Sequence, residues 1–148
     1  RGTEKNPGRV VTLIKSTDDN DIVYGMGYKI ASNKVDEVIK HLDFREKNGY
    51  ERFETCFYPI EGTSDPKKTI VYVADERNPS WNKDHEVTSI AQQVFSAEGP
   101  SGPNITYVYN LCEAMREHFP KHHREDSHLF DIERLLKDME TQKKAEGS

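Results

Sequence analysis

The stretch ASNKVDEVIKHLDFREKNGYERFETCFYP, residues 31–59, predicts a helix that is followed closely by a strand. Val35, Ile39 and Leu42 recur at the spacing of one helical face, which is typical of an amphipathic helix. The segment RFETCFYP predicts the strand, and its final proline ends it. The stretch therefore indicates a chain that mixes helix and sheet.

Both ends of this helix carry residues that are typical of helix termini. Ser32 or Asn33 can cap the first turn through a side-chain oxygen. Asn48 and Gly49 tolerate positive φ angles, so they can close the last turn. The sequence thus predicts that the helix ends just before Asn48.

Glu46 lies in the last turn, eleven residues after Val35, and the apolar stripe passes through it. The stripe predicts that this carboxylate faces inward. Partial burial and the negative helix end both disfavour its ionised form, which suits a general base. In the alternative, Glu46 frays outward or pairs with Arg45 or Lys47 as a solvated helix end.

Three further strands are predicted, at residues 9–16, 21–30 and 69–74. The last is a nearly continuous apolar run, which favours a central strand. Gly25 and Gly27 leave one face of the second strand bare, so that a backbone or a ligand can approach it closely. As a fragment of a nucleotide-binding fingerprint they are weak, because no third glycine opens a helix after them.

Helices dominate the second half of the sequence. The periodicity predicts them at about residues 84–97 and 104–119, and from Asp126 or Ser127 onward. Their predicted inner faces share an apolar character and comprise Val87, Ile90, Ala91, Val94 and Phe95; Tyr107, Val108, Leu111, Cys112 and Met115; and Leu129, Ile132, Leu135 and Leu136.

Strands that come first and helices that come later indicate an α+β fold rather than a doubly wound parallel sheet. We expect a small, strongly curved mixed sheet or β-barrel with helices around it. The predicted strands are one or two too few to close such a barrel. One domain is expected over residues 1–140, and residues 141–148 are expected to form a frayed tail.

The composition narrows the class of protein. A chain of 148 residues fits one domain, and its net charge of −5 argues against nucleic acid as a partner. No apolar run approaches the roughly 20 residues that cross a bilayer, so no membrane association is expected. Cys56 and Cys112 have neither the number nor the spacing of a disulfide framework or a zinc site. These features indicate a reducing, intracellular compartment.

A histidine cluster near the sequence PKHHRED suggests a metal site at first sight: His118, His122, His123 and His128. These residues straddle a proline-containing loop and lack the His-x-x-x-His spacing of a helical metal site. We therefore favour a solvated loop, and no metal is expected.

Ser101 and Tyr107 are two further candidates. Ser101, in GPSG, lacks the strand that precedes a hydrolase nucleophile, so a loop between two helices with Asn104 as N-cap is favoured. Tyr107 faces inward from the first turn of the next helix. Such a tyrosine is usually part of the core, but its hydroxyl needs a partner, which a carboxylate or a substrate amine could provide.

Several segments, in matching order and spacing, resemble the ChaC-like, glutathione-specific γ-glutamylcyclotransferases. The resemblance runs from Arg1 to about Leu136 and rests on NPGRVVTL, FREKNGY, FYP, the segment Ala97–Asn104 with Tyr107 after it, and DSHLFDIERLL. The single motifs are weak, but the ordered set is specific to this family.

The resemblance implies an enzyme that cleaves glutathione into 5-oxoproline and cysteinylglycine without a metal or an organic cofactor. It maps the family's general acid/base onto Glu46, and it implies a cytosolic protein. The substrate's α-amine must lose a proton before it attacks its own γ-carbonyl, and the same carboxyl group can return a proton to the leaving amine. Tyr107 is a candidate substrate contact.

The family's Tyr-Gly-Ser-Leu loop, whose backbone amides bind the γ-glutamyl group, has no counterpart here. We therefore expect a strand and a loop upstream of Arg1, and poor glutathione binding by residues 1–148 alone. Two alternatives stay open: a cyclotransferase for other γ-glutamyl peptides or amines, and a non-catalytic form of the fold that binds an unknown protein partner.

Overall fold

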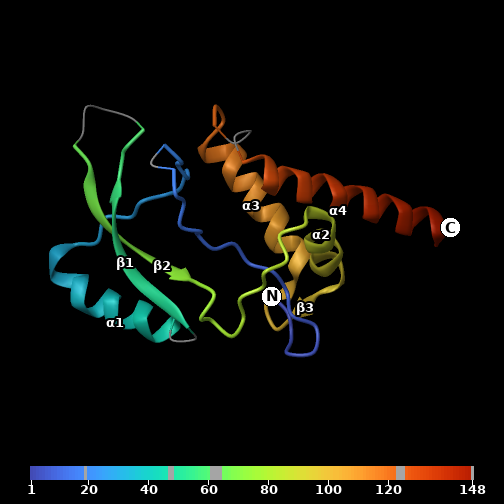
Figure 1. Cartoon of the computed structure of the whole chain (residues 1–148), viewed down its shortest axis with the longest axis horizontal. Coiled ribbons are helices and arrows are strands. Elements are labelled where there is room, and N and C mark those ends of the chain that lie inside the picture. The colour runs from blue at the N-terminus through green and yellow to red at the C-terminus, as the bar shows by residue number, and fades with distance from the viewer. Residues whose placement is uncertain (19, 47–48, 61–64, 123–125, 148) are drawn as a thin grey trace. The chain divides into compact units, whose positions relative to one another are not determined.

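The computed structural model describes residues 1–18, 20–46, 49–60, 65–122 and 126–147. The chain forms two compact units (Figure 1). One is the segment Thr12–Lys83, and the other combines Arg1–Val11 with Asp84–Ser148. We refer to them as the sheet unit and the helical unit and describe each by itself. The single domain expected over residues 1–140 stays a prediction.

The sheet unit holds one helix and one antiparallel pair of strands. Its elements are η1 (Ser32–Lys34), α1 (Val35–Arg45), β1 (Tyr50–Phe57) and β2 (Lys67–Ala74). The two strands pair along their whole length, with Tyr50 opposite Ala74 and Phe57 opposite Lys67 (Figure 1). The helix and the strand predicted within residues 31–59 are thus confirmed.

A carboxylate attaches helix α1 to this sheet. Asp43 accepts hydrogen bonds from Arg52 Nη1 on β1 at 3.1 Å and from the Tyr72 hydroxyl on β2 at 2.6 Å. Desolvation and the hydrogen bond to Asp43 raise the pKa of Tyr72. These bonds fix the last turn of the helix against both strands.

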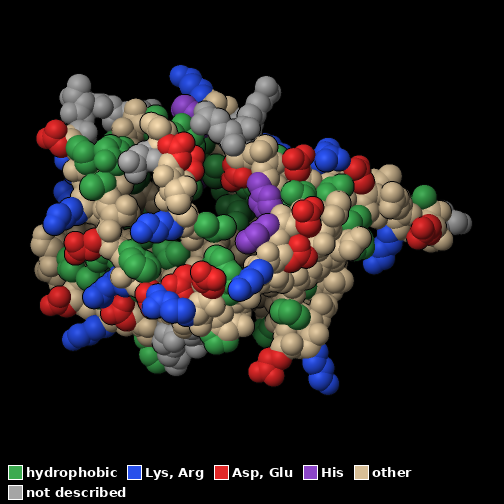
Figure 2. All heavy atoms as spheres, in the orientation of Figure 1, with side chains coloured by type: hydrophobic (Ala, Val, Ile, Leu, Met, Phe, Trp, Pro, Cys, Tyr) green, Lys and Arg blue, Asp and Glu red, His purple; other side chains and the backbone are tan. Residues whose placement is uncertain are grey.

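The strands predicted at residues 9–16 and 21–30 are wrong, because neither segment forms a strand in the described structure. Alternating apolar residues favour an extended chain, but a strand also needs a neighbour to receive its backbone hydrogen bonds. Side chains of these segments remain exposed, such as Ile22 at 67% and Tyr28 at 84%. Figure 2 shows hydrophobic side chains at the surface among charged ones.

The α+β class with a small sheet is confirmed, whereas no barrel is closed by the described residues. The strand predicted at residues 69–74 belongs to a two-stranded sheet and is therefore not a central strand. Gly27 instead packs against an aromatic ring, since a Cβ built there would lie 3.1 Å from the ring of Phe57.

The helical unit contains α2 (Val87–Ser96), β3 (Glu98–Gly99), β4 (Gly102–Pro103), α3 (Asn104–His118) and α4 (Ser127–Glu146). The three helices pack on one another around an apolar core. The buried members of this core are Ile90, Ala91, Val94, Val108, Cys112, Leu129, Ile132 and Leu136. All of them belong to the inner faces that the helical periodicity predicts.

The starts of three helices show one side-chain cap that was not predicted and two predicted caps that are absent. Asp126 caps α4, as its side chain accepts a hydrogen bond from Leu129 N. Ser32 and Asn33 instead form a 3₁₀ turn before α1 without a side-chain cap. Asn104 is not a cap either: it is the first residue of α3, and its amide is used elsewhere.

Helix α4 is longer than the sequence indicates. It continues to Glu146, so most of the tail expected at residues 141–148 is helical, with exposed side chains. None of the helices in the described ranges is long and apolar enough to cross a membrane.

Candidate active site

Glu46 lies at the junction between helix α1 and strand β1. Its backbone N–H donates to Leu42 O at 2.9 Å, which continues the helical bonding. Its carbonyl accepts from Tyr50 N, the first residue of β1, at 3.3 Å. Glu46 therefore belongs to both the last turn of the helix and the turn that enters the sheet.

The inward orientation predicted for Glu46 is confirmed. The half-buried positions of the helix and its end form one stripe, comprising Val35, Val38, Ile39, Leu42 and Glu46, whereas the other side chains of α1 are exposed. A single carboxylate thus continues the apolar face of the helix at the point where the helix stops.

The Glu46 side chain keeps limited access to solvent. It is 26% exposed, and its Oε1 lies 3.8 Å from Nη2 of Arg45, whose side chain is 61% exposed. An ion pair this long with an exposed arginine is weak. Lys47, the other suggested partner, lies outside the described residues. The carboxylate is therefore sheltered but reachable, which a group that exchanges protons with a substrate requires.

Tyr107 belongs to the helical unit. It is half-buried, and its hydroxyl oxygen accepts a hydrogen bond from Val11 N at 3.1 Å. The Arg1 guanidinium lies 5.4 Å from the centre of its ring, within the range of a cation–π contact. The hydroxyl hydrogen has no acceptor among the residues that the structure describes, so it can still be donated.

The amide of Asn104 holds the N-terminal segment beside Tyr107. Its Oδ1 accepts from Arg9 N at 2.5 Å, and its Nδ2 donates to Arg9 O at 2.8 Å. Asn104 is completely buried, so these bonds are formed out of water. Arg9 Nε also donates to Gln93 Oε1 at 2.8 Å. The sequence marks Asn104 only as a cap, and its two bonds span 95 positions in the chain.

The remaining candidates gain no chemical role. Ser101 is exposed in the short turn between β3 and β4, where its carbonyl accepts from Arg1 Nη1 at 2.6 Å. His123 lies outside the described residues, as does part of the histidine-rich loop. Within the ranges that the structure describes, no three His, Cys, Asp or Glu side chains are grouped to hold a metal ion.

Comparisons with known proteins agree on one family. The sequence matches the family described as ChaC-like protein over residues 1–139. Glutathione-specific γ-glutamylcyclotransferase 1 of Homo sapiens is 34% identical over 134 residues, which cover 89% of this chain and 59% of the human protein. The protein of the same name from Danio rerio is 35% identical, over 92% of this chain and 68% of the fish protein.

A solved structure is similar to nearly the whole chain. The crystal structure of a γ-glutamyl cyclotransferase specific to glutathione from yeast matches with a TM-score of 0.71 and 22% identity. The match covers 94% of this chain and 81% of the yeast chain. At this identity the likeness concerns the fold alone, and it agrees with the α+β class.

The sequence match covers nearly the whole chain, and the relatives that exceed 30% identity are all named γ-glutamylcyclotransferases. The chain itself spans about 59% of the length of the human relative. The chain therefore belongs to the ChaC-like family.

Proposed function

We propose that the protein containing this chain is a γ-glutamylcyclotransferase that converts glutathione to 5-oxoproline and cysteinylglycine. The observation that carries the proposal is the position of Glu46. A half-buried carboxylate ends the apolar stripe of α1 in a chain whose human and zebrafish relatives are named glutathione-specific γ-glutamylcyclotransferases. Because the chain spans only part of those relatives, the activity is a proposal for the full-length protein.

In the proposed reaction, Glu46 first takes a proton from the α-ammonium group of the γ-glutamyl residue. The freed α-nitrogen then attacks the γ-carbonyl carbon, and the new C–N bond closes a five-membered ring. The ring nitrogen then gives up a second proton to water, the old amide bond breaks, and Glu46 returns its proton to the cysteinyl nitrogen as it leaves. The released amine takes up the second proton from water. Atoms and charge balance without a cofactor, because the nucleophile, the electrophile and the leaving group all belong to the substrate.

Intramolecular attack reduces what the protein must supply. Holding the γ-glutamyl arm folded replaces a bimolecular encounter, and hydrogen-bond donors aimed at the tetrahedral oxyanion stabilise the transition state. We assign Tyr107 as a substrate contact. Its hydroxyl oxygen accepts a hydrogen bond from Val11 N, and its hydroxyl hydrogen can be donated to the substrate. The proposal includes a cytosolic location, which two free thiols support: exposed Cys56 and buried Cys112.

The test is a substrate panel with the purified full-length protein. Glutathione, γ-glutamylalanine and glutathione disulfide are incubated separately, and mass spectrometry follows 5-oxoproline and the released amine. We expect 5-oxoproline and cysteinylglycine from glutathione at a rate far above that from γ-glutamylalanine. Equal rates on both peptides would assign a broader γ-glutamyl cyclotransferase. No 5-oxoproline from any of them would indicate a non-catalytic form of the fold.

A further inference from the structure

Gly49, the residue before strand β1, lies very close to Asn78, which follows strand β2. Gly49 has a φ angle of 87°, in the left-handed region that favours glycine. A Cβ built on it would lie 2.9 Å from Nδ2 of Asn78, so a side chain at this position would displace that amide. The backbone of the turn therefore lies directly against the side chain of Asn78.

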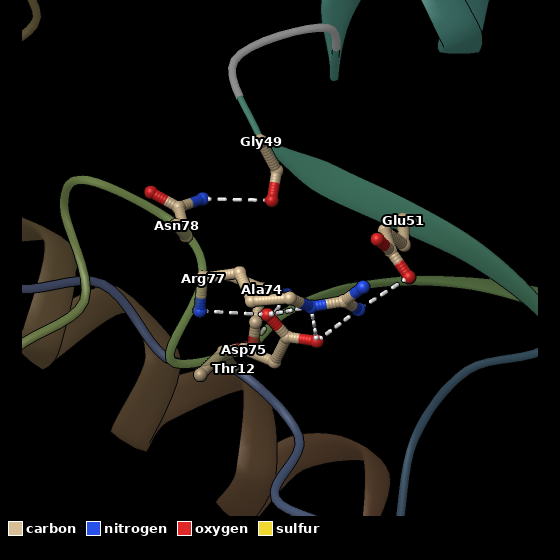
Figure 3. Close-up of polar contacts among 7 residues, drawn as sticks. All are labelled: Thr12, Gly49, Glu51, Ala74, Asp75, Arg77 and Asn78. Carbon is tan, nitrogen blue, oxygen red and sulfur yellow. Dashed lines mark hydrogen bonds and ion pairs between the residues drawn. The ribbon is translucent and has the colours of Figure 1, made fainter.

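Asn78 holds this turn by a hydrogen bond. Its Nδ2 donates to the carbonyl of Gly49 at 2.9 Å (Figure 3). Its Oδ1 accepts from Ser80 N at 2.8 Å, which fixes the orientation of the amide. Only 5% of the residue is exposed, so the bonds are formed largely out of water. An unpaired carbonyl in such a place costs about 1–3 kcal/mol.

The backbone of Asn78 is itself anchored to strand β2. Its N–H donates to Asp75 O at 2.8 Å, and its carbonyl accepts from Trp81 N at 2.9 Å. Asp75 directly follows the last residue of β2, Ala74, which pairs with the first residue of β1. The backbone of Asn78 is thus fixed to the end of β2, and β2 pairs with β1, which begins directly after Gly49.

Other contacts also hold the loop that follows β2. Arg77 pairs with Glu51 on β1 at 2.8 Å and also with Asp75 (Figure 3). Nearby, the hydroxyl of Thr12 accepts from Ala74 N at 3.2 Å. The Arg77 contacts are exposed and do not reach the turn, so they provide a matched control for Asn78.

We infer that Asn78 is a positioning residue, which sets the direction of the Glu46 carboxylate through the Gly49 carbonyl. The inference rests on the proposed function of Glu46. Asn78 is bonded to the carbonyl of Gly49, and the N–H of the next residue, Tyr50, donates to Glu46 O at 3.3 Å, so this path links Asn78 to the backbone of Glu46. A displacement of about 1 Å at a catalytic group can reduce the rate about 100-fold. Loss of the hydrogen bond from Asn78 to Gly49 should therefore lower kcat.

The test compares two conservative variants in the full-length protein. Asn78→Asp keeps the size and the acceptor for Ser80 N but cannot donate to Gly49. Arg77→Gln removes the exposed ion pairs of the same loop. We expect Asn78→Asp to lower kcat about 10- to 100-fold with KM changed less than about threefold, and Arg77→Gln to keep kcat within about twofold. Both are assayed well below their thermal midpoints.

A double variant separates positioning from general disorder of the loop. If Asn78 acts only through Glu46, adding Asn78→Asp to Glu46→Gln should reduce the remaining rate less than about twofold. If Asn78→Asp does not fold, Gly49→Ala disturbs the same bond from its other side and should lower kcat in the same way. Its kcat then decides the inference.

Three results would overturn the inference: an unchanged kcat in folded Asn78→Asp, an equal loss in Arg77→Gln, or fully multiplicative losses in the double variant. In each of these cases the wild-type protein still cleaves glutathione, so the proposed function stands. If the wild-type protein releases no 5-oxoproline, the proposed function fails and the inference falls with it.

Discussion

The two compact units differ in what holds them together. In the helical unit, eight apolar residues of three helices are buried against one another. In the sheet unit, Ala74 and Asn78 are the only buried residues among those described, and α1 has none. Polar contacts carry more of the structure there, as Asp43 ties α1 to both strands and Asn78 holds the turn at Gly49.

This difference indicates that most of the folding free energy comes from one unit, whereas the proposed catalytic group lies in the other. Apolar burial contributes roughly 25 cal/mol per Å², so the helical unit has the larger source of folding free energy. The proposed base, Glu46, lies in the unit with little apolar burial, at a turn set by directional hydrogen bonds. Functional segments are often drawn from the less stable parts of a fold. Substitutions in the two units should therefore affect different measurements.

The largest effect on stability should come from the centre of the helical core. Leu136 is completely buried, and Leu136→Ala should lower the free energy of unfolding by about 2–5 kcal/mol. Ile70 on β2 is 40% exposed, and Ile70→Ala should cost less than about 1 kcal/mol. Urea denaturation followed by circular dichroism measures both. Equal losses would show that the sheet unit is packed as tightly as the helical one.

A smaller loss of folding free energy is expected at Asn104, whose buried amide forms hydrogen bonds instead of apolar contacts. Asn104→Ala removes both hydrogen bonds to the Arg9 backbone and should cost about 1–3 kcal/mol. Asn110 is exposed on the same helix, so Asn110→Ala should stay within about 0.5 kcal/mol. If the two variants unfold at the same urea concentration, Asn104 does not hold the N-terminal segment in solution.

A pH-dependent contribution is expected from Glu133, which is 6% exposed in α4. Its hydrogen bonds to Arg116 and Lys137 outweigh its desolvation and hold its pKa below the ordinary 4.5. A lowered pKa stabilises the folded state above pH 4.5, and this stabilisation is lost as the pH falls below that value.

Thermal unfolding at pH 7 and at pH 3.5 tests this linkage. The wild-type midpoint should fall more on acidification than that of Glu133→Gln, which cannot titrate at this position. Parallel changes in the two proteins would mean that the paired carboxylate of Glu133 contributes nothing to acid sensitivity.

Tyr107→Phe should lower the free energy of unfolding by less than about 1 kcal/mol, because one hydrogen bond from Val11 N is lost. Its effect on kcat/KM should exceed tenfold if the hydroxyl contacts the substrate. Tyr109→Phe is a matched control on the same helix, since it removes a 2.8 Å bond to Glu140 and no proposed substrate contact. Equal kcat/KM values for the two variants would remove Tyr107 from the site.

The helical part of the fold is predictable because its signals are local. The period of apolar residues identifies the inner faces of α2, α3 and α4, and the same period places Glu46 on the inward side of α1. The predicted start of the last helix, at Asp126 or Ser127, is also local, because the Asp126 side chain bonds only three residues ahead.

The rest depends on contacts between distant positions. The apolar residues at 9–16 and the alternation at 21–30 predict an extended chain, but they carry no information on whether a pairing strand is present. Asn78 reaches Gly49 across 29 positions, and Asn104 reaches Arg9 across 95. An asparagine favours loops and caps, so its sequence neighbourhood does not reveal that its amide holds a distant backbone.

The most direct test of the account is the rate of 5-oxoproline release from glutathione by full-length protein carrying Glu46→Gln. Glu37→Gln is the control, because Glu37 lies on the same helix, 71% exposed and paired with Lys34 at 2.7 Å. We predict a loss of about 100-fold or more for Glu46→Gln, with an unchanged circular dichroism spectrum, and wild-type rates for Glu37→Gln. A folded Glu46→Gln protein that retains more than about a tenth of the wild-type rate would contradict the assignment of Glu46 as the general base.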